Sequence, residues 1–149
     1  MSVVPRFGRL ITAMVTPFDE SGALNLDAAR DVARFLVEQG NEGLVVAGST
    51  GEGTSLSDAE KLDLFACVVE AVSVPVLAGS TSADTAASVA LTRRATQTGV
   101  AGILATTPAY ARPNQTGIAG HLGAVAEATD LPVMLYDIPS RTGRKIAGA

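Results

Sequence analysis

Residues 43–52 read Gly-Leu-Val-Val-Ala-Gly-Ser-Thr-Gly-Glu, an unbroken apolar run followed at once by glycines and hydroxyl groups. An apolar run without alternation is typical of a strand that is covered on both faces, as strands of parallel sheets are. Three glycines within residues 48–53 permit a tight turn whose backbone N–H groups can point at an anion. We therefore predict a buried strand over residues 43–47. After it comes either an anion-binding turn or a plain glycine-rich turn with capping hydroxyls.

Four further apolar runs of the same kind recur along the chain. They occupy residues 10–15, 74–78, 102–105 and 132–136, so that successive runs start about thirty residues apart. One strand and one crossover helix together have that length. The sequence thus predicts five parallel strands that alternate with four helices, followed by a loop.

The four intervals carry the signals of amphipathic helices. In the first, Ala29 and Ala33 share a face, and Gly40 stands where a left-handed residue is expected to end the helix. The second opens on Ser57-Asp58-Ala59-Glu60, a capping box. We expect the third over about residues 84–98 and the fourth over about 115–129. The side chains expected to form the buried stripes of the last three helices are Leu62, Phe65, Ala66 and Val69, then Ala87, Ala90, Leu91 and Ala95, then Ile118, Leu122, Val125 and Ala126.

Composition excludes several classes of protein. Of the 149 residues, 47% are hydrophobic and 17% are charged, which is not the composition of a disordered chain. The formal net charge of -4 argues against a nucleic-acid-binding protein, which usually carries a basic surplus. The single cysteine, Cys67, excludes a disulfide framework and a multi-cysteine zinc site. A reducing, cytoplasmic location is therefore expected, and no run approaches the roughly 20 apolar residues of a membrane helix.

Two architectures fit the alternation of strands and helices. One is an open, doubly wound sheet, and the other is part of a (β/α)8 barrel, which needs eight strands and about 250 residues. In both, ligands collect where the strands end. Serine, threonine and tyrosine are concentrated there, together with Arg141, and this set suits a small carboxylate substrate.

Four ordered motifs at these strand ends resemble the dihydrodipicolinate synthase family. This family belongs to the pyruvate-dependent class I aldolases, which include N-acetylneuraminate lyase. The motifs cover residues 12–18, 48–52, 107–113 and 135–143, in the family's order and spacing. The resemblance favours the barrel. It implies that residues 1–149 form the first four βα units and the fifth strand of a partial TIM (β/α)8 barrel, with no separate second domain.

The resemblance also implies roles at the pyruvate end of a site. In the family, pyruvate becomes a Schiff base on a lysine. Thr50, with backbone N–H groups of the Ser49-Thr50 turn and with Gly48 and Gly51, would bind the pyruvate carboxylate. Tyr136 would move protons during imine formation.

Two further roles concern the relay and the second substrate. Ser49 would pass a hydrogen bond between Tyr136 and Tyr110, and the latter reaches in from a neighbouring subunit in the family, which implies a dimer or tetramer. Arg141 would bind the carboxylate of aspartate semialdehyde. A phenol, whose pKa is ordinarily near 10, needs such a hydrogen-bonded relay to act at neutral pH.

The function implied is that of a cytoplasmic lyase, 4-hydroxy-tetrahydrodipicolinate synthase. It would condense pyruvate with aspartate semialdehyde on the way to diaminopimelate and lysine, without a cofactor or metal. Ser49 also occurs in the lyase branch, so an N-acetylneuraminate or keto-deoxy-sugar lyase is an alternative, although Arg141 favours the synthase. A half-barrel without catalytic activity, associating with itself or with a partner, is a third interpretation.

The lysine is the main departure from the family pattern. The family places it at the end of a sixth strand, one βα unit beyond Tyr136, whereas the sequence contains only Lys61 and Lys145. We expect Lys61 on the outer ring of a barrel and Lys145 in a loop, both as ordinary surface residues. The expectation is therefore a synthase segment truncated before its Schiff-base lysine and inactive on its own. His121 and Cys67 are expected to be structural.

Overall fold

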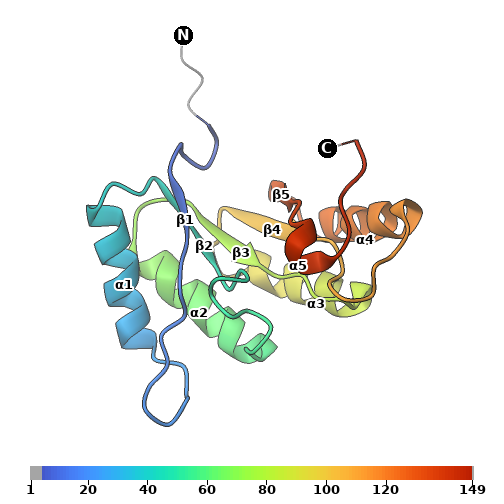
Figure 1. The fold of residues 1–149 in the computed structure, drawn as a ribbon. Coiled ribbons are helices and arrows are strands. Elements are labelled where there is room, and N and C mark those ends of the chain that lie inside the picture. Colours follow the sequence, from blue (N-terminus) through green and yellow to red (C-terminus); the bar gives the residue numbers. More distant parts are fainter. Residues whose placement is uncertain (1–4, 149) are drawn as a thin grey trace.

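The computed structural model describes residues 5–148, in which strands and helices alternate as the sequence predicts (Figure 1). The strands are β1 (Ile11–Ala13), β2 (Gly43–Val46), β3 (Val76–Gly79), β4 (Gly102–Thr106) and β5 (Val133–Tyr136). The long helices are α1 (Leu26–Glu38), α2 (Asp58–Ala71), α3 (Thr85–Thr96) and α4 (Gln115–Glu127). The segment after β5, expected as a loop, contains the short helix α5 (Pro139–Thr142).

The strand order decides between the two architectures. The five strands are all parallel and pair in sequence order, β1-β2-β3-β4-β5. A doubly wound sheet reverses its strand order at a switch point, whereas a barrel adds each strand beside the last. Right-handed crossovers then put all helices on the same face of the sheet, as Figure 1 shows for α1 to α4. The prediction of a partial barrel is confirmed.

Both faces of the central strands are apolar. In β2, Leu44 and Val46 point into the main core between the sheet and the helices. Val45 points the other way and packs with Leu77 and Leu104 on the concave face of the sheet. Because residues of a strand alternate between faces, a run without polar residues is what a strand covered on both sides requires.

The helix termini follow the sequence signals. The Ser57 hydroxyl accepts a hydrogen bond from the Glu60 backbone N–H at 3.3 Å, while the Glu60 carboxylate accepts one from the Ser57 backbone N–H at 2.8 Å. Gly40 has a φ of +94°, in the left-handed region that glycine tolerates after a helix. Asn25, Asp84 and Asn114 cap the other long helices. The capping box and the glycine end are both confirmed.

The expected stripe of α2 is confirmed at Phe65 and is only partly buried at its other positions. The fully buried side chains of this helix are Lys61, Leu64, Phe65, Cys67 and Val68. Leu62, Ala66 and Val69 are only partly buried. The helix packs against both α1 and α3 as well as against the sheet, so a face wider than one narrow stripe is covered.

Two expectations for α3 and one for α4 are also corrected. Ala87, Ala90 and Ala126 are exposed. On α3, the buried positions that the two alanines were expected to fill are occupied by Ser88 and Thr92. Thr92 shares a hydrogen bond with Ser80 at 2.7 Å, and such pairing lets a hydroxyl be buried without an unsatisfied polar atom. Among the helices of the described residues, none is long and apolar enough to cross a membrane.

Candidate functional site

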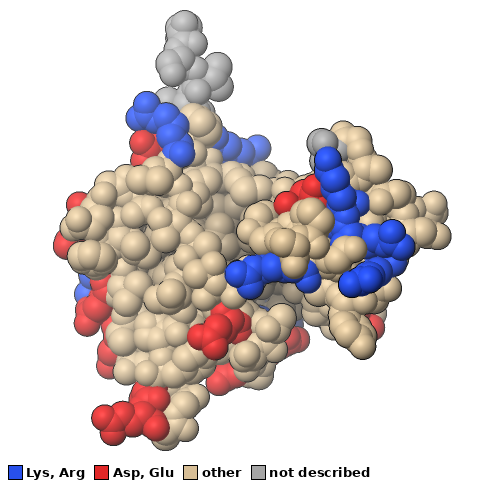
Figure 2. All heavy atoms as spheres, in the orientation of Figure 1, with Lys and Arg blue, Asp and Glu red and all other residues tan. Residues whose placement is uncertain are grey.

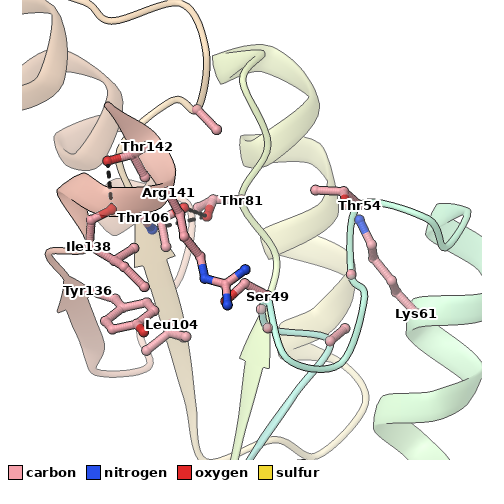
Figure 3. A pocket seen from close by; sticks show the side chains of 15 residues that line it. Ser49, Thr54, Lys61, Thr81, Leu104, Thr106, Tyr136, Ile138, Arg141 and Thr142 are labelled. Atoms are coloured by element: carbon pink, nitrogen blue, oxygen red, sulfur yellow. Dashed lines mark hydrogen bonds between the residues drawn. The ribbon is translucent and has the colours of Figure 1, made fainter. Parts of the chain in front are cut away.

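A pocket of about 270 Å³ lies where the carboxyl ends of β2, β3, β4 and β5 meet (Figure 3). Its walls come from the turn after β2, from Gly79 at the end of β3 and Thr81 beyond it, from the end of β4 and from the segment that leads into α5. Parallel strands bring these distant segments to a single edge of the sheet. In barrel enzymes this is the edge that carries the active site.

Four of the predicted site residues line the pocket together. They are Gly48, Ser49, Tyr136 and Arg141. Figure 3 shows the Arg141 guanidinium extending from α5 toward Ser49, with the ring of Tyr136 on the wall beside Leu104. The pocket therefore combines a cation, a hydroxyl and a phenol, which is the chemistry needed to bind a small carboxylate and to move a proton near it.

Hydrogen bonds to backbone carbonyl groups hold the turn after β2 in a fixed shape. The Thr16 hydroxyl donates to the Gly51 carbonyl at 2.6 Å, and the Gly53 N–H donates to the Gly48 carbonyl at 3.1 Å. A Cβ on Gly53 would overlap the carbonyl oxygen of Ala47, so this position requires glycine. Two predicted residues of the turn, Thr50 and Gly51, are not among those that line the pocket. Thr50 is exposed, and Gly51 is buried against β1.

Tyr110 lies outside the pocket. It is 97% exposed and has a φ of +68°, which is a strained conformation for a tyrosine. Its side chain borders a second hollow, beside α5, that also includes Arg141. Among the described residues no hydrogen bond joins Ser49 to Tyr136 or Tyr110, so the predicted relay is not formed within this chain. An exposed tyrosine at this edge is available to a neighbouring subunit, as the resemblance implies.

Arg141 is presented by the short helix α5. Gly143 ends this helix with a φ of +77°, and its N–H donates to the Pro139 carbonyl at 2.9 Å. The Thr142 hydroxyl donates to the Ile138 carbonyl at 3.1 Å and is buried. These contacts fix the backbone on both sides of Arg141 while its side chain stays exposed.

Lys61 corrects an expectation of the sequence analysis. Instead of lying on the surface, it is 7% exposed and lines the pocket. Its side chain rises from the first turn of α2, and its ammonium group ends near Thr54 (Figure 3). No local sequence signal marks this position, because it depends on how α2 packs against the glycine-rich turn. Lys145, by contrast, is exposed as expected.

Two threonines of the pocket had no role assigned from sequence. Thr81 follows β3, and Thr106 is the last residue of β4. Their hydroxyl oxygens lie 3.2 Å apart, and the Thr106 backbone N–H donates to the Thr81 hydroxyl at 3.1 Å. The pairing of Gly79 with Leu104 across β3 and β4 places these two residues side by side at the carboxyl ends of the two strands.

Electrostatics around the pocket favours an anion. The residues that line it include Lys61 and Arg141 but no aspartate or glutamate. Figure 2 shows other Lys and Arg side chains gathered around α5, although the chain as a whole has a net charge of -4. A local cluster of one sign raises the concentration of ligands of the opposite sign.

The remaining titratable candidates have structural surroundings. The Cys67 thiol contacts the Leu26 carbonyl at 3.3 Å, and burial raises its pKa. His121 is 3% exposed, shares a hydrogen bond with the Thr85 hydroxyl through Nδ1 at 2.9 Å, and has a pKa lowered chiefly by burial. Within residues 5–148 no group of three or more His, Cys, Asp or Glu side chains is placed to hold a metal ion.

A parallel barrel-type sheet with an anion-binding pocket at its carboxyl edge defines a class of enzyme scaffold, and the comparisons specify the family. Residues 6–148 match the model of the dihydrodipicolinate synthetase family. The chain belongs to this family.

Similar proteins agree with this assignment. The chain is 53% identical to 4-hydroxy-tetrahydrodipicolinate synthase 2 of Halalkalibacterium halodurans over 138 residues, which are 91% of the chain and 47% of that protein. It is 52% identical to the synthase of Symbiobacterium thermophilum, covering 93% of the chain and 48% of the relative. The crystal structure of dihydrodipicolinate synthase from Bacillus anthracis superposes with a TM-score of 0.92 at 41% identity, covering 97% of the chain and 50% of that structure. The chain thus spans about half the length of these relatives.

Proposed function

We propose that this chain carries the substrate-binding portion of a 4-hydroxy-tetrahydrodipicolinate synthase. That enzyme condenses pyruvate with aspartate semialdehyde through a Schiff base, on the way to diaminopimelate and lysine. The observation that carries the proposal is the meeting of Ser49, Tyr136 and Arg141 in one pocket at the strand ends. About 50% identity to relatives named as this synthase supports the same conclusion.

Different groups of the pocket bind the two substrates. Arg141 binds the carboxylate of aspartate semialdehyde, because a guanidinium can donate two parallel hydrogen bonds to a carboxylate. Backbone N–H groups of the Gly48–Ser49–Thr50 turn bind the carboxylate of pyruvate. Tyr136 moves protons to and from the carbonyl oxygen of pyruvate during imine formation, and Tyr110 of a neighbouring subunit completes its relay through Ser49.

The Schiff-base nucleophile of the proposed reaction is neither lysine of this chain. A nucleophilic amine must be unprotonated and close to the pyruvate carbonyl. Lys145 is exposed, and Lys61 extends along the β2–α2 turn from a helix rather than from a strand end. We infer that residues 1–149, as half of a (β/α)8 barrel, bind substrate without turning it over.

The assembly and the location belong to the same proposal. A dimer or tetramer would bring Tyr110 of one subunit to the pocket of another, and its 97% exposure leaves it free to do so. The cytoplasm is where a biosynthetic enzyme of this family would meet both metabolites.

An N-acetylneuraminate or keto-deoxy-sugar lyase is the second candidate. It is favoured by Ser49, since this serine also occurs in that branch of the superfamily. The two candidates differ in the second substrate, for which Arg141 is the proposed ligand. A panel of aldehydes and sugar acids offered with pyruvate distinguishes them.

The test joins this chain to the part of the Halalkalibacterium halodurans synthase that the match leaves uncovered. We expect the hybrid to condense pyruvate with aspartate semialdehyde, and the Arg141→Ala hybrid to lose at least tenfold in kcat/KM for the aldehyde, since a charged hydrogen bond contributes about 1.5–3 kcal/mol. The matched control is Arg93→Ala, an exposed arginine on α3. A folded hybrid that accepts only sugar-derived aldehydes would contradict the synthase assignment.

Borohydride reduction tests the placement of the nucleophile. With pyruvate present, we expect a covalent adduct on the hybrid and none on residues 1–149 alone, as read by intact-protein mass spectrometry. An adduct mapped to Lys61 or Lys145 would contradict the assignment.

A further inference from the structure

Two hydroxyl groups on the pocket wall form a pair that the proposed catalytic scheme does not use. The hydroxyl oxygens of Thr81 and Thr106 lie 3.2 Å apart, and both residues line the pocket. The backbone N–H of Thr106 donates to the Thr81 hydroxyl at 3.1 Å. Figure 3 shows the pair on the side of the pocket from which Arg141 extends. The pair is therefore fixed in position by the backbone.

Counting hydrogens shows that the pair has one donor to spare. Each hydroxyl carries one hydrogen and can accept through its lone pairs. One of the two hydrogens is used between the two oxygens, whichever of them donates. The second hydrogen has no acceptor from another residue among the described hydrogen bonds. Because the Thr81 oxygen also accepts from a backbone N–H, the pair is polarised toward donation.

The surroundings determine what this donor can bind. No carboxylate lines the pocket, so the spare hydrogen is not taken up by an acidic side chain there. Both residues are partly buried, which makes an unmade hydrogen bond costly once a ligand has displaced water. Arg141, on the same pocket, already supplies the charge that a carboxylate requires.

We propose that the Thr81–Thr106 pair is a specificity determinant that donates a hydrogen bond to the oxo oxygen of the substrate whose carboxylate binds Arg141. This inference rests on the proposed function and deepens it, since aspartate semialdehyde carries both a carboxylate and an aldehyde oxygen. The pair contributes to recognition of the aldehyde, while Arg141 recognises the acid.

Selectivity against analogues without the oxygen follows from this arrangement. A site built to hydrogen-bond an oxygen rejects the analogue that lacks it, because the buried donor is then left unpaired. An apolar wall of the same shape would not make this distinction. The two hydroxyls therefore raise the affinity for oxo acids relative to that for plain acids.

The experiment uses two matched probes and the chain itself. 4-Oxobutanoate has a carboxylate and an aldehyde, and butanoate has the same carbon chain without the oxygen. Each is titrated into the isotopically labelled chain, and the backbone amide shifts of the pocket residues give a dissociation constant. Pyruvate is titrated as a third probe.

The key variant replaces both threonines by valine, which keeps the side-chain shape and removes both hydroxyls. We expect it to bind 4-oxobutanoate about three- to tenfold more weakly than the native chain, as the loss of one net hydrogen bond predicts. Its affinity for butanoate should not fall, because butanoate makes no hydrogen bond to the pair and leaves its donor unpaired in the native chain. The double replacement by serine should restore native affinity. The single variant Thr106→Val keeps the Thr81 hydroxyl, which accepts a hydrogen bond from the Thr106 backbone N–H. It therefore shows whether a loss of affinity in the double variant comes from a local loss of structure.

The control for the double valine variant is a threonine outside the pocket. Thr116→Val, on the exposed face of α4, should change neither dissociation constant. Equal weakening of both acids by the double valine variant, or no weakening of either, would overturn the role of the pair while leaving the proposed function intact. If none of the three probes shifts the pocket amides of the native chain, the proposed function fails and this inference fails with it.

Discussion

The ammonium group of Lys61 brings a second positive charge to the pocket that contains Arg141. Because the side chain is almost fully enclosed, water screens this charge less than it would a surface lysine. Replacing it by methionine keeps most of the packing and removes the charge. We expect Lys61→Met to weaken binding of pyruvate by up to about fivefold, with a smaller loss at high salt. Titrations followed by amide shifts measure this.

The control for this prediction is the other lysine. Lys145 is exposed and does not line the pocket, so Lys145→Met should leave the affinity unchanged. Equal effects of the two variants would mean that Lys61 acts only through the net charge of the chain.

His121 makes stability depend on pH. Burial lowers its pKa below the ordinary value of 6.5, and the carboxylate of Asp84 and the backbone of Thr106 oppose this shift without reversing it. The unfolded chain therefore takes up a proton more readily than the folded chain. Stability contributed by the neutral imidazole is present above about pH 6.5 and is lost as the pH falls toward the lowered pKa.

Urea unfolding between pH 7.5 and pH 5 tests this statement. We expect the free energy of unfolding to fall over that window in the native chain, and to fall less in His121→Asn, which has no group that titrates there. Carboxylates with lowered pKa values, such as Asp19, act at lower pH and do not obscure the comparison. Parallel curves for the two proteins would contradict the prediction.

At the level of single residues, sequence reasoning succeeded where a motif fixes a position along the chain. Ser49, Tyr136 and Arg141 were predicted as strand-end residues, and they line one pocket. Thr81 and Thr106 were also expected among the strand-end hydroxyls, but no role was assigned to them, because the approach of their side chains depends on the pairing of β3 with β4. Lys61 was placed wrongly, because its approach depends on the packing of α2 beneath a turn. Neither relation leaves a periodic signal in the sequence.

The element scale begins with the capping box of α2. The Ser57 hydroxyl satisfies one of the N–H groups that a helix leaves without a partner at its start. We expect Ser57→Ala to lower the free energy of unfolding by about 1 kcal/mol, measured in urea. Ser55→Ala, in the preceding turn, is the control and should have little effect, since Ser55 is exposed and its hydroxyl forms none of the hydrogen bonds found between described residues. Equal losses in the two variants would contradict the capping role.

Gly120, inside α4, is a position where a substitution should stabilise the chain. Gly120 is exposed, and a Cβ built on it has no neighbour within 4 Å. We expect Gly120→Ala to raise the free energy of unfolding by up to about 1 kcal/mol, because alanine loses less backbone entropy in a helix. Gly53→Ala should instead destabilise the chain, since its Cβ would overlap the Ala47 carbonyl. Thermal melts of both variants check the two signs together.

Elements were predicted better than their buried faces. The cap at Ser57 and the end at Gly40 are local signals, and both were confirmed. The stripe of α2 was right at Phe65 but missed other buried positions of the helix, because two neighbouring helices cover it as well as the sheet. In α3, paired hydroxyls such as Ser80–Thr92 replace apolar side chains in the interior, which a count of hydrophobic residues cannot foresee.

At the scale of the whole molecule, the two outermost strands differ from the central three. β1 and β5 each pair on one side only among the described residues, and Leu10, Val15 and Leu135 are each 53% exposed. Unpaired strand edges with apolar side chains favour association. We expect residues 1–149 in isolation to elute as a species larger than their 15.1 kDa mass.

A charge on one edge tests this expectation. Leu135→Lys should shift the population toward the monomer, as measured by size-exclusion chromatography with light scattering. Phe35→Lys, an exposed position on helix α1 rather than on a strand, is the control. A native chain that is already monomeric at high concentration would show that these edges do not drive association.

The sequential order of the strands has a consequence for how the protein is made. Each strand from β2 to β5 pairs with the strand that is synthesised just before it. Its partner is therefore already present when the strand leaves the ribosome. Each pairing closes a loop of only one βα unit, which costs less chain entropy than pairing with a strand farther along the chain. On a translating ribosome, each βα unit can therefore dock as it emerges, and the growing sheet serves as the template for the next strand.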